Sequence, residues 1–467
     1  METRLPVAAL AIVLLVLSQS VVPVVHGAGS GPLAGSRTAF GCTAAVNLSN
    51  STSRSYLPEE EGDPVAAGNN VYMAWSAGNT QIMFLSSHDA GKTFGTPIGL
   101  NVNPTRQAYG PRIATNGSDV YVAWQAINTN GSSSVLFRVS TDNGSTWGTT
   151  VALAGAGGSL PADVWLPQIQ AWGSNVYVAW AESISGLAQV YIRVSSDNGN
   201  TFGPAMNLSN DTERAWEPVL AVVRSNVYVA WDDLINAGNS EVYFRASSNM
   251  GATFGPVLNL SSAADFDDEP AISATGGSVY VVWHHVGVGD VGDGTYFRAS
   301  QNRGSSFFPV VEFLSGVSGL ARYTTVVSKG HNVYLAWRDN SSGSFDVLFA
   351  ASHNNGGSFT PTVDLATNTG ITSVTGADYL GDRPQLAVET QGVFATWAQN
   401  VSGNYEIFYN AITANGKLLG QNLNVSRDAG ASTLPLIATS QNQAYLIWQD
   451  TSTASQVANT FYSVCLP

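Results

Sequence analysis

The fold of this chain is decided by residues 217–261. They read EPVLA at 217–221, NVYVAW at 226–231, EVYFRAS at 241–247 and NLS at 259–261. Each piece alternates apolar with small or polar residues, which is typical of a strand with two different faces, and Val, Tyr, Phe and Trp favour strands. The stretch therefore predicts a four-stranded antiparallel meander of about 50 residues.

The same pattern recurs along the chain. Its second segment ends in tryptophan in eight copies spaced by 49 to 60 residues, at Trp75, Trp124, Trp180, Trp231, Trp283, Trp337, Trp397 and Trp448. A proline opens the innermost segment in seven copies, at Pro64, Pro111, Pro167, Pro218, Pro270, Pro384 and Pro435, and Thr324 takes that place in the sixth. Proline suits the first residue of a strand, where its missing N–H breaks no ladder bond.

The two ends of the chain complement each other. The eighth repeat stops after its third segment at residues 460–464, whereas residues 44–49 match a fourth segment with no repeat before them. Radial repetition of four-stranded sheets is the architecture of a β-propeller. We therefore predict an all-β chain whose residues 42–467 form one propeller domain. It would have eight four-stranded antiparallel blades and be closed by the N-terminal strand; six or seven blades are the alternatives.

The N-terminus has the pattern of a targeting segment. Glu2 and Arg4 precede an apolar run over residues 5–17, and small residues follow at 27–30. We expect residues 1–27 to be a secretory signal and residues 28–41 a linker, with an uncleaved membrane anchor as the alternative. The only cysteines, Cys42 and Cys465, would form a disulfide in a secreted or cell-surface protein, with two free thiols as the alternative.

A short motif follows the third segment. The pattern Ser-x-Asp-x-Gly-x-Thr-aromatic occurs at residues 87–94, 140–147 and 195–202, and three further copies have Asn in the Asp place. It resembles the Asp boxes, or bacterial neuraminidase repeats, of the sialidase superfamily, over nearly the whole chain after the N-terminal segment. The resemblance implies hairpins on the propeller face away from an active site. We expect a structural role, with the aromatic packed back onto the blade, for the boxes of Asp89, Asp142, Asp197, Asn249, Asn302 and Asn354.

Chemistry in such a propeller is expected at the opposite mouth, in the loops before each innermost strand and after each tryptophan. These loops place flat aromatics beside acids and arginines, as a sugar-binding surface requires. The candidate ligand-binding residues are Tyr109, Trp165, Arg214, Trp216, Glu217, Asp233, Arg338 and Asp339. The alternative is that the rings cover the blade cores and the charges solvate the loops.

The sialidase resemblance also implies a catalytic set. The family binds the substrate carboxylate with three arginines, the first in an Arg-Ile-Pro motif, and uses a Tyr–Glu nucleophile pair and an Asp acid/base. The closest match is Pro111-Arg112-Ile113-Ala114, where alanine replaces the motif's proline. The set therefore does not transfer, and the catalytic residues stay unassigned; the candidates are Arg112, Arg214, Arg322, Arg383, Asp233 and Glu217.

Two other residue groups belong to the repeat. Arginines occupy one equivalent position of the third strand, at Arg138, Arg193, Arg245 and Arg298, so we expect them to be structural. Glycosylation sequons that lie outside the repeated Asn-Leu-Ser segment are the better sites for glycans, at Asn130, Asn340 and Asn400.

Composition limits the partners. The net charge is −14, and lysine occurs only at Lys92, Lys329 and Lys417, so we expect no nucleic-acid partner and no membrane contact beyond an N-terminal anchor. We expect no cofactor; Ca²⁺ would rest on mouth carboxylates alone. The sequence favours a monomeric propeller that binds extracellular glycans or glycoproteins without cleaving them. The alternatives are a divergent exo-sialidase-like glycoside hydrolase and a structural cell-envelope component.

Overall fold

The structure is a computed structural model that describes residues 41–467 apart from short stretches. The chain divides into Met1–Pro32 and Leu33–Pro467, and the described residues all belong to the second part. The expected signal segment and residues 28–40 of the expected linker lie outside the described residues. So do residues 50–54, 57–63, 79, 102–106, 129–130, 156–162, 185–186, 211, 237–238, 262–265, 288–292, 315–320, 343–345, 367–382, 391, 428 and 452–457.

Every regular element in the described part is a β-strand, and no helix there could cross a bilayer. The innermost strands are β4 (Val65–Ala67), β8 (Gln107–Asn116), β12 (Asp163–Trp172), β16 (Arg214–Val223), β20 (Phe266–Thr275), β24 (Ala321–Lys329), β28 (Gln385–Glu389) and β32 (Ser432–Ser440). The second strands are β5 (Asn70–Ala77), β9 (Asp119–Ile127), β13 (Asn175–Ile184), β17 (Asn226–Asn236), β21 (Ser278–Val286), β25 (Asn332–Asp339), β29 (Gly392–Val401) and β33 (Gln443–Asp450).

The third strands are β6 (Gln81–Ser87), β10 (Ser133–Ser140), β14 (Leu187–Ser195), β18 (Asn239–Ser247), β22 (Gly294–Ser300), β26 (Asp346–Ser352), β30 (Asn404–Thr413) and β34 (Asn459–Leu466). The outer strands are β7 (Ile98–Gly99), β11 (Val151–Ala152), β15 (Met206–Asn207), β19 (Leu258–Asn259), β23 (Val311–Leu314), β27 (Val363–Asp364) and β31 (Leu423–Asn424). Three short strands precede them, β1 (Gly41–Cys42), β2 (Val46–Asn47) and β3 (Ser55–Tyr56).

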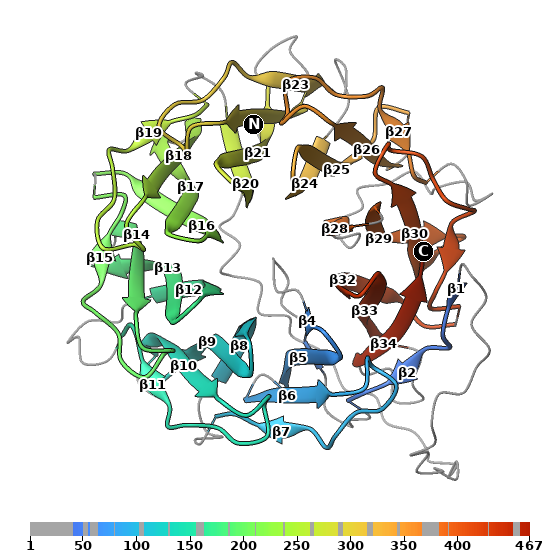
Figure 1. Ribbon diagram of the computed structural model, residues 1–467, viewed down its shortest axis with the longest axis horizontal. Helices are drawn as coiled ribbons and strands as arrows, with labels where there is room; N and C mark the ends of the chain where they lie inside the picture. The colour runs from blue at the N-terminus through green and yellow to red at the C-terminus, as the bar shows by residue number, and fades with distance from the viewer. Residues whose placement is uncertain are drawn as a thin grey trace. The chain divides into compact units, whose positions relative to one another are not determined.

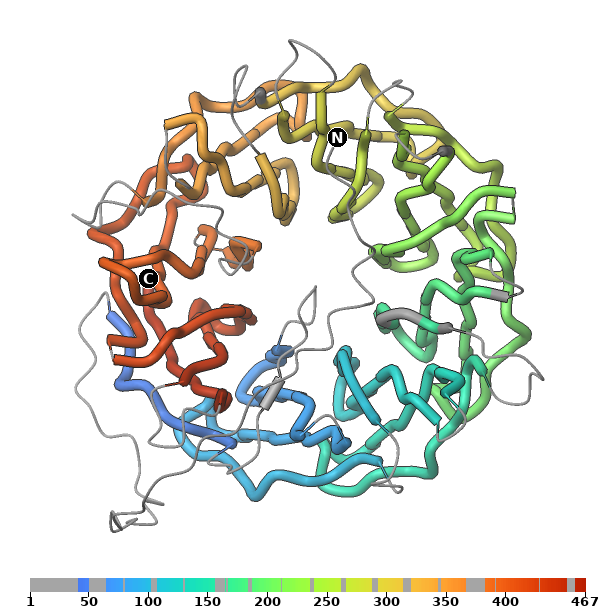
Figure 2. The backbone as a smooth tube through the Cα atoms, turned by 180° about the vertical axis from the view of Figure 1, so that it is seen from behind, coloured from blue at the N-terminus to red at the C-terminus, as the bar shows by residue number. Residues whose placement is uncertain are grey.

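The strands form antiparallel meanders arranged around a ring. Each meander, called a group here, corresponds to one sequence repeat, and its strands pair in sequence order from the innermost outward. One parallel bridge, Ser240↔Phe266, joins β18 to β20 and merges two groups into one eight-stranded sheet. The innermost strands pack against one another in chain order, and β32 packs against β4 (Figure 1). The chain is therefore an all-β propeller, and Figure 2 shows the same order from behind.

The ring closes through both ends of the chain. Both β1 and β2 pair with β34, in the registers Cys42↔Cys465 and Val46↔Tyr462. Cys42 and Cys465 form a disulfide across 423 residues. Closure by the N-terminal strand and the pairing of the two cysteines are thus as the sequence predicts.

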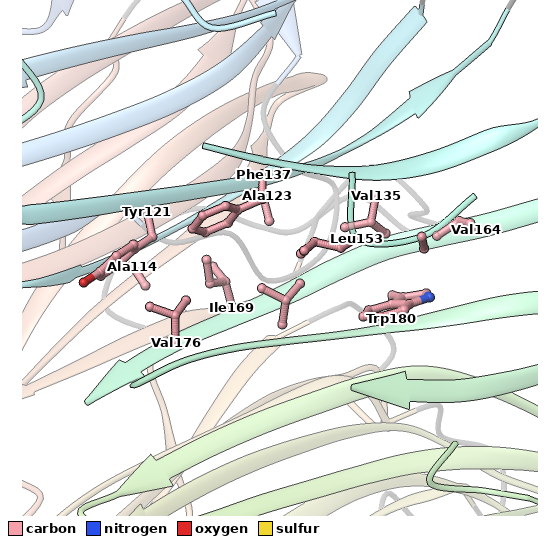
Figure 3. Packing of buried hydrophobic residues seen from close by; sticks show 12 residues of the cluster. Ala114, Tyr121, Ala123, Val135, Phe137, Leu153, Val164, Ile169, Val176 and Trp180 are labelled. Atoms are coloured by element: carbon pink, nitrogen blue, oxygen red, sulfur yellow. The ribbon is translucent and has the colours of Figure 1, made fainter. Parts of the chain in front are cut away.

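Cores lie between neighbouring sheets. In one of them Tyr121 and Phe137 of one group meet Ile169, Val176 and Trp180 of the next (Figure 3). The eight repeated tryptophans are among the largest fully buried side chains. Burial of the indole at each repeat explains the regularity of the pattern, since truncating a buried Trp to Ala costs about 3–5 kcal/mol.

The Ser-x-Asp/Asn-x-Gly turns share one set of hydrogen bonds. Asp142 Oδ1 accepts from Ser140 Oγ at 2.8 Å and from the Thr146 backbone N–H at 2.8 Å, while Asp142 Oδ2 accepts from Thr146 Oγ1 at 2.6 Å. Asn249 keeps the first two bonds, and its Nδ2 donates to Thr253 Oγ1. These bonds hold the turn closed in the Asp and the Asn copies alike.

The aromatic of each turn packs onto the preceding sheet, a more specific placement than the sequence predicts. The ring of Trp147 meets Phe84 edge-on at 4.8 Å, and Phe202 meets Phe137 at 4.9 Å. The turn glycine enters the same contact, because a Cβ on Gly144 would lie 2.5 Å from the Phe84 ring and its φ is +83°. The turns therefore join neighbouring sheets, which is a structural role.

Two of the repeated third-strand arginines, Arg138 and Arg245, have a structural role. Arg245 Nε donates to Gly255 O at 2.7 Å and its Nη1 to Leu208 O at 2.9 Å. Arg138 makes the equivalent bonds to Gly148 O and Leu100 O. Both guanidinium groups thus fasten the third strand to the turn of its own repeat and to the outer strand of the preceding repeat.

Candidate functional site

The two ends of the sheets differ. The Ser-x-Asp/Asn-x-Gly turns contact the turns that join innermost to second strands, as in the bond from Asn143 N to Ser118 O at 2.8 Å. The other end, where innermost strands begin and second strands finish, is called here the mouth end. It carries most of the sequence-predicted site residues.

A repeated β-bulge shapes the mouth end. The pairing of innermost with second strands shifts register just before the strand-opening residue in six groups, for example between Trp216 and Val219. The bulged residue has positive φ at Gly110 (51°), Glu217 (44°), Glu269 (52°), Tyr323 (57°) and Leu434 (52°). Non-glycine residues there cost on the order of 1–3 kcal/mol each, and such strain is concentrated at functional sites.

Directly before each bulge stands one cross-strand pair, and these are called the mouth pairs. They are Tyr109↔Gln125, Trp165↔Ala181, Trp216↔Asp232, Asp268↔His284, Arg322↔Arg338 and Thr433↔Gln449. The innermost-strand members Tyr109, Trp216, Asp268, Arg322 and Thr433 are half-buried; the side chain of Trp165 lies outside the described residues. Because the pairs are equivalent by register, they bring aromatic, acidic and basic groups to the same level of the ring.

One step closer to the strand ends than each mouth pair lies a buried residue that can accept a hydrogen bond from the repeated tryptophan. Trp180 Nε1 donates to Glu182 Oε2 at 3.0 Å, Trp397 Nε1 to Gln399 Oε1 at 3.3 Å and Trp448 Nε1 to Asp450 Oδ2 at 3.4 Å. Asp233 and Asp339 occupy the same place in their repeats and are also buried. The structure thus places these two predicted ligand-binding residues inside the sheets, away from the mouth surface.

The predicted arginines fall into distinct positions. Arg322 and Arg338 face each other as one mouth pair. Arg214 is exposed at the start of β16, and Arg383 is half-buried just before β28. Arg112 follows the bulge and is 2% exposed, so it lies deeper than the mouth pairs. The five candidate arginines therefore come from four repeats and do not share one level.

Two neighbouring histidines at the mouth end, His284 and His285, each have a carboxylate partner. His284 Nδ1 bonds Asp268 Oδ1 at 2.7 Å, and its Nε2 lies 3.9 Å from Asp293 Oδ2. His285 Nδ1 bonds Asp267 Oδ1 at 2.9 Å, which also accepts from Trp283 Nε1 at 2.8 Å. The His285 ring stacks on Tyr296 with centroids 4.0 Å apart. This sector of the mouth end is a fixed network of acids and imidazoles.

His284 is the strongly perturbed group of this network. Burial alone would lower its pKa, but the hydrogen bond with Asp268, the nearby Asp293 carboxylate and the charges of Asp268 and Glu269 raise it to about 9. The ring is therefore an imidazolium at neutral pH, held between two carboxylates.

His284 and Asp268 lie in the loops that the sequence predicts to carry the site, although neither is among the candidate residues chosen from them. Asp268 stands two residues before Pro270 and His284 follows Trp283, as Trp216 and Asp232 do around Pro218 and Trp231. Aligning the repeats on both the proline and the tryptophan would have indicated that these residues pair. Within the described stretches no three His, Cys, Asp or Glu side chains are placed to share a metal ion.

Comparison with known proteins leaves the family open. No family model and no curated protein matches the chain. Among solved structures it is similar to a polysaccharide lyase of family PL25, an ulvan lyase, at TM-score 0.49 and 11% identity over 81% of this chain and 96% of that one. An arabinanase of Penicillium chrysogenum gives 0.39 and 16% over 68% and 93%, and the Trypanosoma rangeli sialidase 0.38 and 12% over 68% and 55%. These likenesses are too distant to assign an activity.

Proposed function

We propose that this chain is an exported eight-bladed propeller of the Asp-box type that binds glycans at its mouth end. The observation that carries the proposal is the ring of mouth pairs. Half-buried aromatic side chains, Tyr109 and Trp216, stand at the same level as a carboxylate, Asp268, and a guanidinium, Arg322.

This set of groups suits a sugar. A flat ring covers the apolar C–H face of a pyranose or furanose, and charged groups accept from or donate to its hydroxyls. The bulges fix the backbone that carries these side chains. Binding a ligand therefore loses little backbone conformational entropy at these positions. The blade count rests on the eight tryptophan repeats, and export on the N-terminal pattern and the disulfide.

A glycan array with the purified protein tests the proposal, followed by calorimetric titration of the glycans retained. Trp216→Ala should abolish or strongly weaken binding. Trp172→Ala is the matched control, because Trp172 is 46% exposed and lies at the opposite end of the sheet beside the turn. Retention of no glycan by the wild-type protein would overturn the proposal, as would equal effects of the two variants.

Cleavage of the bound glycan is a second candidate, favoured by the hydrogen bond between Asp268 and His284. The bond from His284 orients the Asp268 carboxylate, so Asp268 would suit the role of a base or a charge stabiliser. A panel of chromogenic glycosides and sialosides tests it, with Asp268→Asn, Arg214→Ala and Arg322→Ala as variants. Inactivity of the wild-type protein across the panel would leave binding as the function.

A further inference from the structure

Asp268, His284 and Thr295 stand in one row across β20, β21 and β22. The registers Asp268↔His284 and His284↔Thr295 put the three side chains on the same face of the sheet. We infer that Asp268 is an oriented carboxylate that receives adjacent hydroxyl groups of an uncharged sugar ring, and that His284 is its positioning residue. The inference rests on the proposed glycan binding and adds to it the chemical class of the ligand.

The carboxylate is held from behind. Its Oδ1 bonds the Nδ1 of His284 at 2.7 Å, and His284 is 1% exposed whereas the Asp268 side chain is 18% exposed. One oxygen is thus tied to an interior ring while part of the group faces solvent. An ionised carboxylate only accepts hydrogen bonds and has about four lone-pair sites, so it can receive two neighbouring hydroxyls at once.

The imidazole ring is itself fixed. Its Nε2 faces Asp293 Oδ2 at 3.9 Å, and Thr295, directly opposite on β22, is fully buried. The ring therefore has a hydrogen-bonded carboxylate on one side and a second carboxylate 3.9 Å away on the other. A rigid second partner of this kind is what keeps a binding group in its productive orientation.

The negative charge of Asp268 selects the kind of ligand group that can lie against it. Glu269 follows Asp268 in the bulge and Asp293 faces His284, while Arg322 and Arg338 form the mouth pair of the next repeat. A carboxylate or sulfate placed against Asp268 would meet a like charge and be repelled, whereas a hydroxyl can donate a hydrogen bond to it. The ligand group at this place is therefore neutral, in contrast to the acidic sugar that a sialidase-type site would take.

The neighbouring repeat supplies an aromatic ring, Trp216, on which the sugar can stack. Trp216 holds the equivalent place to Asp268, since Trp216↔Asp232 and Asp268↔His284 are both mouth pairs. Their strands β16 and β20 pack side by side. A ring stacked on Trp216 would thus turn its edge hydroxyls toward Asp268.

The experiment uses an array on which each neutral oligosaccharide stands beside the same chain oxidised at C6 to the uronate. The wild-type protein should prefer the neutral member of each bound pair. Asp268→Asn should weaken neutral binding by roughly ten- to a hundredfold, the value of a hydrogen bond to a charged group. It should also reduce the preference for the neutral member, which general destabilisation would not do.

His284 is tested by two variants. His284→Gln can still donate to Asp268 and should keep most of the affinity, whereas His284→Leu should lose it; melting temperatures check that both fold. Asp119→Asn, at the opposite end, is the control for loss of a carboxylate. If wild type binds glycans but Asp268→Asn leaves affinity and preference unchanged, this inference alone fails; if wild type binds none, the proposed function fails with it.

Discussion

Phe94 of the first repeat packs edge-on against Tyr462 of the last, with ring centroids 4.8 Å apart. The same contact joins consecutive repeats at Phe84–Trp147, Phe137–Phe202, Phe244–Phe307 and Phe297–Phe359. The junction between the chain ends is therefore built like the junctions within the chain. It differs by the added disulfide and the pairing of β1 and β2 with β34.

Cys42→Ser should lower the melting temperature and make the C-terminal repeat more sensitive to protease. The disulfide restrains the unfolded chain across 423 residues, which is worth up to about 6 kcal/mol in the chain-entropy description. Differential scanning calorimetry and limited proteolysis measure both effects, with wild type under reducing conditions as the comparison. An unchanged melting temperature and cleavage pattern would contradict a stabilising role for the closure.

The turns that contain Asp should make the folded protein less stable at acid pH. Hydrogen bonds from Thr146 and Ser140 lower the pKa of Asp142 to about 2, and those from Thr201 and Ser195 do the same for Asp197. Because the folded pKa is depressed, the contribution is present above about pH 4 and is lost as the pH falls toward 2. Melting temperatures between pH 5 and 2 should show this loss.

Replacing Asp89, Asp142 and Asp197 together by Asn should flatten that acid dependence and change stability little at neutral pH. Asn249 already makes the equivalent bonds in the fourth repeat, with its Nδ2 donating to Thr253. A large loss of stability at neutral pH would show that the charge, and not the bond pattern, closes the turns.

His284 should make stability fall at alkaline pH. Its folded pKa of about 9 lies above its usual value of 6.5. The contribution is therefore fully present below about pH 6.5 and is lost as the pH rises through 9, by up to a few kcal/mol. His284→Gln should remove this pH dependence, and ¹⁵N NMR should find both ring nitrogens protonated at neutral pH. A ring that titrates near 6.5 would contradict the paired geometry.

Much of the fold follows from the sequence because burial imposes a period. Each second strand must bury one indole, so Trp75 to Trp448 mark those strands directly. Proline is a weaker marker, because Pro64 does not share the register of the other prolines. Val65 pairs with Tyr72, three residues before its tryptophan, whereas Val219 pairs with Ala230, directly before Trp231.

The site was less predictable because it depends on register. The sequence places acids and aromatics at the mouth end, yet a one-residue step decides which face of the strand a side chain takes. Asp232 belongs to a mouth pair and is 8% exposed, whereas Asp233 beside it belongs to the next pair and is 1% exposed. The positive-φ bulge before Pro218 sets this step, and nothing in the residues 214–217 alone indicates it.

The most direct test of the account is the affinity of wild type, Trp216→Ala and Trp172→Ala for a glycan retained on the array, measured by calorimetry at neutral pH. Loss of one stacked aromatic should weaken binding by roughly ten- to a hundredfold in Trp216→Ala, while Trp172→Ala matches wild type. Equal affinities for Trp216→Ala and wild type, with both proteins folded, would contradict glycan binding at the mouth end.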